Sequence, residues 1–202
     1  VTFLDKNGNT FAWRGDQLGN IITSTSISPM LKNAIVATED KRYYRHFGIS
    51  PRGILGAIKT NLKAGRGPLK GSGGSTITQQ TAKLICLGKK YNPNKWKSER
   101  QYEADCRRTT KTRKIKEAVF AIIMEFRYTK DEILSLYLNR AYLGAGSRGF
   151  EAASQRYFST SSNKLDIGQS AMLAGLLKAP STYAPTNNIH KAQTRANVVV
   201  RL

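Results

Sequence analysis

The sequence is poor in acidic residues and cysteines, and it has no long apolar run. Only 13 Asp and Glu stand against 33 Lys and Arg among its 202 residues, which gives a formal net charge of +20. Two cysteines are too few for a small domain built on disulfides. The longest apolar run, residues 118–124, is far shorter than the roughly 18 residues that span a bilayer. The 40% hydrophobic content, regularly spaced, excludes a disordered chain.

The start of the sequence has no recognisable signal peptide. We therefore expect any targeting segment or membrane anchor to lie outside these residues.

The surplus of positive charge predicts an anionic partner. Residues 40–70 hold eight Lys and Arg against one acid, and residues 89–116 hold eleven against three. Nucleic acid, an anionic membrane surface and a phosphorylated substrate all fit such a surplus. On composition alone, nucleic acid is the first candidate.

A short β-hairpin is expected first, followed by helices. Strand-like residues around Asn7-Gly8 predict a hairpin over residues 1–13, and residues 1–27 are treated as hairpin and linker. Residues 28–202 form the second expected domain, in which apolar residues recur at helical spacing. Helices are expected at residues 28–48, 52–64, 76–87, 110–127, from 129 onward, and at 149–157, 167–177 and 189–202.

Two details of these helices can be tested directly. Thr76 with Gln79, and Thr129 with Glu132, have the spacing of capping boxes. The helix at 110–127 is expected to have one apolar side, formed by Ile115, Val119, Ile122, Ile123 and Phe126. Residues 89–109 are polar, basic and only weakly periodic.

Two adjacent acids, Glu39 and Asp40, lie in strongly basic surroundings. The ordinary interpretation is a solvated helix end. The cations, tyrosines and His46 that follow favour another one, in which a carboxylate acts as a base and Lys and Arg hold an anionic ligand beside it.

A glycine-rich stretch precedes the expected helix at 76–87. The start of this helix carries hydroxyls and amides, with Lys83 one turn further on; these residues are Ser75, Thr76, Gln79 and Gln80. Helix N-termini bind phosphates through free N–H groups and the helix dipole. The Walker order is absent, and a well-capped helix is the alternative. Two consecutive glutamines favour hydrogen bonding to a polyhydroxylated ligand.

Arg113 and Glu117 are four residues apart and so share one helix face. A surface salt bridge of little energetic value is one interpretation. Beside a second acid and a phosphate-binding helix, the pair would instead hold a leaving group.

Five motifs follow one another in the order Glu39-Asp-x-x-Tyr-x-x-His-x-Gly48, Gly74-Ser-Thr-Ile-Thr-Gln-Gln80, Arg113-Lys-x-x-Glu117, Lys130-x-x-Ile-Leu-x-x-Tyr-Leu-Asn139 and Arg148-Gly-Phe-x-Ala-Ala153. Together they resemble the motifs of the glycosyltransferase family 51 peptidoglycan polymerases. This family includes the transglycosylase domains of class A penicillin-binding proteins and the monofunctional transglycosylases. The match covers residues 28–200.

The resemblance implies a mainly α, lysozyme-like fold with two lobes. It implies polymerisation of lipid II into β-1,4-linked glycan strands, with inversion and release of polyprenyl pyrophosphate. The place would be the periplasmic or extracellular face of the bacterial inner membrane. The implied partners are lipid II, the growing glycan chain, the membrane surface and other cell-wall synthesis proteins, and no nucleic acid.

The resemblance also implies roles for the acids. Glu39 would be the general base that takes a proton from the acceptor hydroxyl. Glu117 would position cations or a metal near the pyrophosphate, or assist the base. Asp40 and His46 would support Glu39.

The resemblance assigns the remaining site residues to substrate binding. The departing pyrophosphate would be stabilised by the cations Lys83, Arg113 and Lys114. The cleft would be lined by Ser75, Thr76, Gln79 and Gln80. No tightly bound cofactor is expected. Mg²⁺ or Mn²⁺ at the pyrophosphate fits the chemistry, but no spacing of metal ligands indicates a dedicated site.

Relative to the family pattern, residues 89–109 form an insertion. It contains Cys106, and Cys86 lies shortly before it. In an oxidising periplasm we expect these two cysteines to pair, with two free thiols as the alternative. Closing a loop of this size would contribute about 3 kcal/mol of stability.

The helix at 52–64 falls where the family's small lobe touches the membrane. Its apolar residues are Ile54, Leu55, Ile58 and Leu62, and the cations around them are Lys59, Lys63, Arg66 and Lys70. Such a helix faces either an anionic lipid surface or the protein core, and both interpretations remain open.

Two other classes of protein stay open at this point. A lysozyme-like glycan hydrolase explains the acids and the fold but leaves the dense cations unexplained. A basic, helical nucleic-acid-binding protein explains the charge but leaves Glu39, Gln80 and Glu117 unexplained, and no known DNA-binding module is present.

Overall fold

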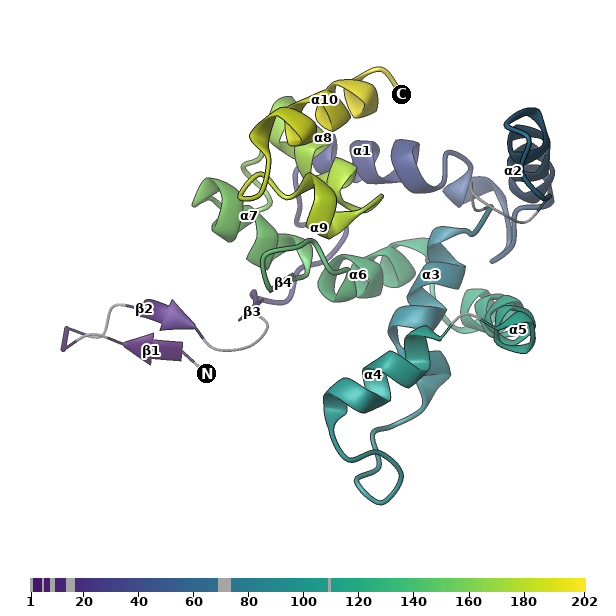
Figure 1. Cartoon of the computed structure of the whole chain (residues 1–202), viewed down its shortest axis with the longest axis horizontal. Coiled ribbons are helices and arrows are strands. Elements are labelled where there is room, and N and C mark those ends of the chain that lie inside the picture. The colour runs from purple at the N-terminus through teal and green to yellow at the C-terminus, as the bar shows by residue number, and fades with distance from the viewer. Residues whose placement is uncertain (1, 5, 8–9, 14–16, 69–73, 109) are drawn as a thin grey trace. The chain divides into compact units, whose positions relative to one another are not determined.

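Helices make up most of the described chain (Figure 1), which confirms the predicted mainly α fold. The computed structural model describes all residues except 1, 5, 8–9, 14–16, 69–73 and 109. The chain divides into two units, Val1–Thr38 with Ala141–Leu202, and Glu39–Arg140. The predicted boundary at residue 27 stays a prediction.

The first unit contains the short strands of the protein. Strands β1 (Thr2–Leu4) and β2 (Thr10–Trp13) pair antiparallel, which confirms the hairpin. Its expected turn at Asn7-Gly8 lies partly outside the described residues. Strand β3 (Gln17–Leu18) pairs in parallel with β4 (Ser147–Arg148), so the region after residue 27 is not wholly helical.

The helices of the first unit are α1 (Pro29–Glu39, of which only the last residue belongs to the second unit), α7 (Phe150–Phe158), α8 (Ile167–Leu176), α9 (Pro180–Tyr183) and α10 (Ile189–Val200). Helices α8 and α10 pack together. Leu31 and Ile35 of α1 and Phe150 of α7 are fully buried, and burying such a side chain contributes about 1.5–3 kcal/mol. The expectation that the first helix continues to Gly48 is wrong, because α1 ends at Glu39.

The helical elements of the second unit are η1 (Tyr43–Arg45), α2 (Pro51–Lys63), α3 (Ile77–Leu84), η2 (Cys86–Gly88), α4 (Glu99–Arg107), α5 (Lys111–Arg127) and α6 (Lys130–Arg140). Helix α3 packs against both α5 and α6, so it lies at the centre of this unit. Within the described residues, no helix combines the length and the apolar character needed to cross a membrane.

Both predicted capping boxes are present. Thr76 accepts a hydrogen bond from the Gln79 N–H at 3.1 Å, and the Gln79 side chain accepts one from the Thr76 N–H at 3.0 Å. Thr129 and Glu132 exchange the equivalent bonds at the start of α6. Each pair satisfies N–H groups that the first helical turn would otherwise leave without partners.

The predicted apolar side of α5 does not face the core. Ile115 is 66% exposed and Phe126 76% exposed, and Val119 and Ile123 are each about half exposed. The buried side of α5 is instead formed by Glu117, Ala121 and Met124. Because periodicity shows only that a helix has two unlike faces, it does not say which face turns inward.

Gly48 allows a close approach between two segments of the second unit. Its φ is +74°, and a Cβ at this position would lie 2.8 Å from the carbonyl oxygen of Ala121 in α5. Its own carbonyl accepts a hydrogen bond from Thr76 Oγ1 at 2.6 Å. Only glycine adopts this positive φ and allows so close an approach to α5 without strain. Gly48 therefore joins the first motif to α3 and α5.

Candidate active site

All eleven predicted site residues lie in the second unit. Helix α3 carries or adjoins several of them, and its capping box fixes how the helix begins. The structure brings the residues together in three groups, around Glu39, around Asp40 and around Glu117. The catalytic and binding roles of the individual residues stay predictions.

The first group contains Glu39 and Gln80. Glu39 is the last residue of α1, and its carboxylate is partly exposed. Gln80 Nε2 in α3 donates a hydrogen bond of 2.7 Å to Glu39 Oε2. The other end of this amide, Oε1, accepts a hydrogen bond of 3.3 Å from the hydroxyl of Tyr137 in α6. The predicted base is therefore held by a residue 41 positions further along the chain.

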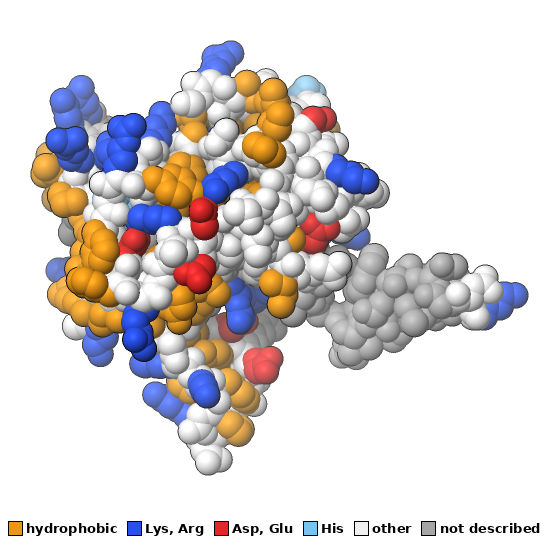
Figure 2. All heavy atoms as spheres, turned by 180° about the vertical axis from the view of Figure 1, so that it is seen from behind, with side chains coloured by type: hydrophobic (Ala, Val, Ile, Leu, Met, Phe, Trp, Pro, Cys, Tyr) orange, Lys and Arg blue, Asp and Glu red, His pale blue; other side chains and the backbone are white. Residues whose placement is uncertain are grey.

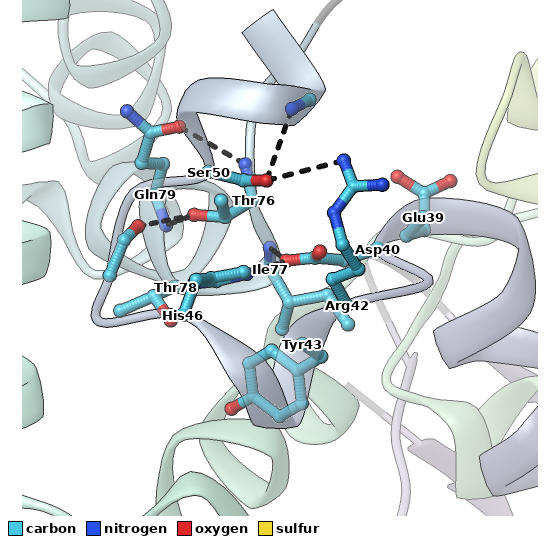
Figure 3. A network of polar contacts seen from close by, with 12 residues as sticks. Glu39, Asp40, Arg42, Tyr43, His46, Ser50, Thr76, Ile77, Thr78 and Gln79 are labelled. Carbon is cyan, nitrogen blue, oxygen red and sulfur yellow. Dashed lines mark hydrogen bonds and ion pairs between the residues drawn. The ribbon is translucent and has the colours of Figure 1, made fainter. Parts of the chain in front are cut away.

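Asp40 holds the start of α3 (Figure 3). Its Oδ2 atom accepts hydrogen bonds from His46 Nε2 at 2.8 Å and from the Ile77 N–H at 3.1 Å. Both side chains are buried, and a carboxylate at a helix N-terminus is stabilised by the helix dipole. His46 Nδ1 is buried and has no hydrogen-bond partner among the described residues. Asp40 and His46 thus hold the segment that follows Glu39.

Thr76 and Gln79 are buried, with 1% and 4% of their surface exposed. Their side chains form the capping box, and Thr76 also donates to the Gly48 carbonyl. Direct contact with a sugar or phosphate would require exposing them, so this contact stays a prediction. Ser75, Gln80 and Lys83 are less deeply buried.

The third group surrounds Glu117, which is 2% exposed. Arg113 Nη2 lies 3.1 Å from one carboxylate oxygen, in the position of an ion pair but not of a well-aligned hydrogen bond. Lys114 Nζ donates to the other oxygen at 3.2 Å and to Ser75 Oγ at 2.6 Å. The predicted i, i+4 pair is confirmed, and it is a buried ion pair rather than a surface one.

Lys83 borders the same group. Its burial, together with the nearby charge of Arg113, lowers the pKa of its ammonium below the ordinary lysine value. Lys114 and Arg107 act in the same direction, and Glu117 opposes them. Lys83, Arg113 and Lys114 therefore gather positive charge around the Glu117 carboxylate. Such an excess of positive charge suits an anionic ligand.

The predicted disulfide between Cys86 and Cys106 is present, and the Cα atoms are 5.2 Å apart. It joins the turn η2 after α3 to α4, a helix within the insertion whose existence the weak periodicity did not predict. Arg113 Nη1 donates a hydrogen bond to the carbonyl oxygen of Cys106. The insertion therefore contacts the Glu117 group through Arg113.

Sequence reasoning did not identify a buried ion pair between Glu125 and Lys130. Lys130 Nζ and Thr78 Oγ1 both lie 2.6 Å from Glu125 Oε1. The ammonium also lies 4.6 Å from the ring centroid of Tyr43, whose hydroxyl donates to the Lys130 carbonyl oxygen at 2.7 Å. The sequence did contain one signal for this pair, because Glu125 directly follows the apolar run 118–124. These contacts tie α3, α5 and α6 together.

Tyr137 is the second residue that sequence reasoning left without a role. It is 2% exposed and contacts the predicted base through Gln80. Burial raises the pKa of its phenol well above the ordinary value, and the charge of Glu39 adds to this effect. Its place in the fourth motif was visible in the sequence, but the contact between α6 and α3 was not.

Comparison with known proteins identifies the family. A sequence profile of the family described as "Transglycosylase" matches residues 7–202. The chain therefore belongs to the transglycosylase family and is a transglycosylase domain, as the five motifs indicated.

The relatives are penicillin-binding proteins. The chain is 37% identical over 202 residues to penicillin-binding protein 1A/1B of Bacillus subtilis, covering 100% of this chain and 20% of the relative. It is 39% identical over 194 residues to penicillin-binding protein 1A of Escherichia coli, covering 96% of this chain and 20% of that relative. It thus spans about a fifth of the length of the curated relatives it matches. A crystal structure of penicillin-binding protein 1A from Haemophilus influenzae also aligns with this chain. The alignment covers 96% of this chain and 16% of the crystallised chain, with a TM-score of 0.48 and 23% identity.

Proposed function

We propose that this domain polymerises lipid II into β-1,4-linked glycan strands. The observation that supports it best is the placement of two unlike groups by α3. Gln80 bonds the Glu39 carboxylate, and Lys83, one turn further along, borders the cations around Glu117. Residues three apart on a helix lie about 5–6 Å from each other. One helix thus serves a base and an anion-binding group.

In this mechanism Glu39 acts on the acceptor. Its carboxylate takes the proton of the GlcNAc 4-hydroxyl as that oxygen attacks C1 of the donor MurNAc. The new O–C1 bond forms as the bond between C1 and the pyrophosphate oxygen breaks on the opposite face, so the anomeric centre is inverted. A neutral hydroxyl is a poor nucleophile, and base assistance typically contributes about 10²–10⁴-fold.

The cations act on the leaving group. Negative charge develops on the pyrophosphate as it departs, and fixed positive charges stabilise it without rearrangement during the step. Lys83, Arg113 and Lys114 supply this charge. Glu117 is buried between Arg113 and Lys114, and its role is to hold those cations in place.

A divalent cation has no evident resident site. Among the described residues, no three His, Cys, Asp or Glu side chains lie together as a bound metal would need. The carboxylate of Glu117 is already paired with two cations. The described residues therefore do not fit a resident Mg²⁺ or Mn²⁺ ion.

The ion pairing of Glu117 favours transfer over hydrolysis. A glycan hydrolase needs a protonated carboxylic acid as well as a second carboxylate. Glu117 is 2% exposed, and each of its carboxylate oxygens faces a cation. Neither oxygen is therefore placed to reach a glycosidic oxygen, whereas the cations suit a site for an anionic leaving group.

Incubation of the domain with purified lipid II tests the proposal. We expect glycan strands that a muramidase digests, together with released polyprenyl pyrophosphate. Digestion of finished peptidoglycan without synthesis would favour the hydrolase. Salt-dependent binding of duplex DNA without synthesis would favour the nucleic-acid-binding protein.

Replacing Lys83 by Gln is expected to lower kcat/KM for lipid II by about 10- to 150-fold, because the variant loses one hydrogen bond to a charged group of the substrate. Lys83→Arg, which keeps the charge, should retain more activity. The matched control is Lys164→Gln, an exposed lysine of the first unit. Equal rates for Lys83→Gln and the control would remove Lys83 from the proposed site.

We also propose that the second unit binds an anionic membrane surface through α5 and α2. Figure 2 shows hydrophobic side chains gathered along one edge of the molecule, with Lys and Arg side chains beside them. The exposed apolar residues of these helices are Ile54, Leu55, Leu62, Ile115, Val119, Ile123 and Phe126. For Ile54, Leu55 and Leu62 the core-facing interpretation is wrong, while Ile58 is half-buried. Of the cations predicted beside them, Lys70 lies outside the described residues.

Replacing Val119 and Ile123 together by Ser is expected to weaken binding to vesicles containing anionic phospholipid by about 10-fold or more. Flotation of the vesicles with bound protein measures it. Ile167→Ser with Ile189→Ser is the matched control, because these two residues are similarly exposed (59% and 50%) but lie in the first unit. Equal losses in both double variants would contradict the proposed surface.

A further inference from the structure

Three residues from three helices form one chain of hydrogen bonds that ends on the proposed base. The Tyr137 hydroxyl donates to Gln80 Oε1 at 3.3 Å, and Gln80 Nε2 donates to Glu39 Oε2 at 2.7 Å. All three residues belong to the second unit. Tyr137 is 2% exposed, so water does not compete freely for its hydroxyl.

The chemistry of the amide makes this chain sensitive to the charge of Glu39. An amide has a donor end and an acceptor end. Next to an ionised carboxylate only the NH₂ end is favourable, and the carbonyl oxygen then needs a donor of its own. The phenol of Tyr137 supplies that donor. Because each hydrogen bond polarises the next, a donor on Oε1 strengthens the bond from Nε2 to Glu39.

Tyr137 is able to keep this role over the working range of pH. Burial and the charge of Glu39 both raise the pKa of its phenol. The hydroxyl therefore stays protonated and remains a donor wherever the base is ionised.

We propose that Tyr137 is a positioning residue for catalysis: through Gln80, it orients the amide toward Glu39 and stabilises the ionised form of that carboxylate. Tyr137 itself does not touch the reacting atoms. The inference rests on the proposed function, because it assumes that Glu39 is the base. A residue of the fourth motif would thus influence the ionisation of the proposed base in the first motif.

The Tyr137→Phe variant tests the inference. Its loss of the phenolic donor weakens the bond to ionised Glu39, and a carboxylate that loses such support has a higher pKa. We expect the acidic limb of the pH profile of kcat/KM for lipid II to move upward by on the order of 0.5–1 pH unit. The rate loss should be largest at low pH and small above the shifted limb.

Tyr43→Phe is the matched control. Tyr43 is also fully buried, and its hydroxyl also makes a hydrogen bond, but to the Lys130 carbonyl oxygen rather than to Gln80. Tyr43→Phe should lower thermal stability without moving the acidic limb. Identical pH profiles for the two variants would overturn the inference.

A second variant keeps the test decisive if Tyr137→Phe folds poorly. Gln80→Met breaks the chain at its middle and should move the acidic limb in the same direction. Combining it with Tyr137→Phe should add little further shift, because Tyr137 would act only through Gln80. Additive shifts would contradict the proposed route. Absence of polymerisation by the unmodified domain would instead contradict the proposed function, so the two failures are distinguishable.

Discussion

Replacing Glu39 by Gln is expected to lower the rate of glycan polymerisation by about 10²–10⁴-fold. The substitution keeps the size of the side chain. Gln80 Nε2, which now donates to Glu39 Oε2 at 2.7 Å, would find the amide oxygen of the new residue in the same place. The local structure should therefore persist. A neutral amide does not accept the proton of the acceptor hydroxyl, so the chemical step should slow while substrate binding remains.

Single-turnover synthesis from lipid II measures this loss, and thermal unfolding checks that the variant is folded. Glu103→Gln provides a matched control, because Glu103 is a partly exposed acid of α4 that pairs with Arg107. It should polymerise lipid II like the unmodified domain. Comparable glycan strands from Glu39→Gln and Glu103→Gln would show that Glu39 is not the base, even though the domain still belongs to its family.

The local features of the fold could be predicted because local chemistry determines them. The capping boxes at Thr76 and Thr129 each depend on two residues that are three positions apart. The pair of Arg113 with Glu117 depends on two residues that are four positions apart. The sequence did not predict helix α4, because its mostly charged and polar residues show little apolar periodicity. Its stability comes from the disulfide and from the contact of Tyr102 with the buried Trp96, whose ring centroids lie 5.0 Å apart.

The long-range features of the site could not be predicted in the same way. Gln80 lies 41 residues from Glu39, and Tyr137 lies 57 residues from Gln80. The packing of α3 against α6 brings Gln80 and Tyr137 together, and the end of α1 brings Glu39 to Gln80. The direction of the apolar side of α5 is a similar case. Burial of Glu117 on the opposite side is tolerated because Arg113 and Lys114 on the same helix pair with its carboxylate.

Loss of the disulfide is expected to lower both stability and activity. The bond joins Cys86 and Cys106 across a separation of 20 residues, and removing it should cost about 3 kcal/mol of unfolding free energy. The Cys106 carbonyl accepts a hydrogen bond from Arg113, and Arg113 pairs with Glu117. Freeing the insertion therefore also frees the guanidinium group that is proposed to face the pyrophosphate.

The double variant Cys86→Ser with Cys106→Ser separates these two effects. Chemical denaturation measures the stability loss. We expect kcat/KM for lipid II to fall by about 10- to 100-fold even where the variant is fully folded, because misplacement of a binding group by about 1 Å has effects of this size. Dithiothreitol should reproduce both losses in the unmodified domain and leave the double variant unchanged.

Two outcomes would contradict this account in different ways. Two reactive thiols in the freshly prepared, denatured domain would show that the bond does not form. A folded double variant with full activity would show that the bond stabilises the insertion but has no influence on the site. In that case Arg113 would be held by Glu117 alone, and the buried ion pair within α5, rather than the contact with the insertion, would set the position of the cations.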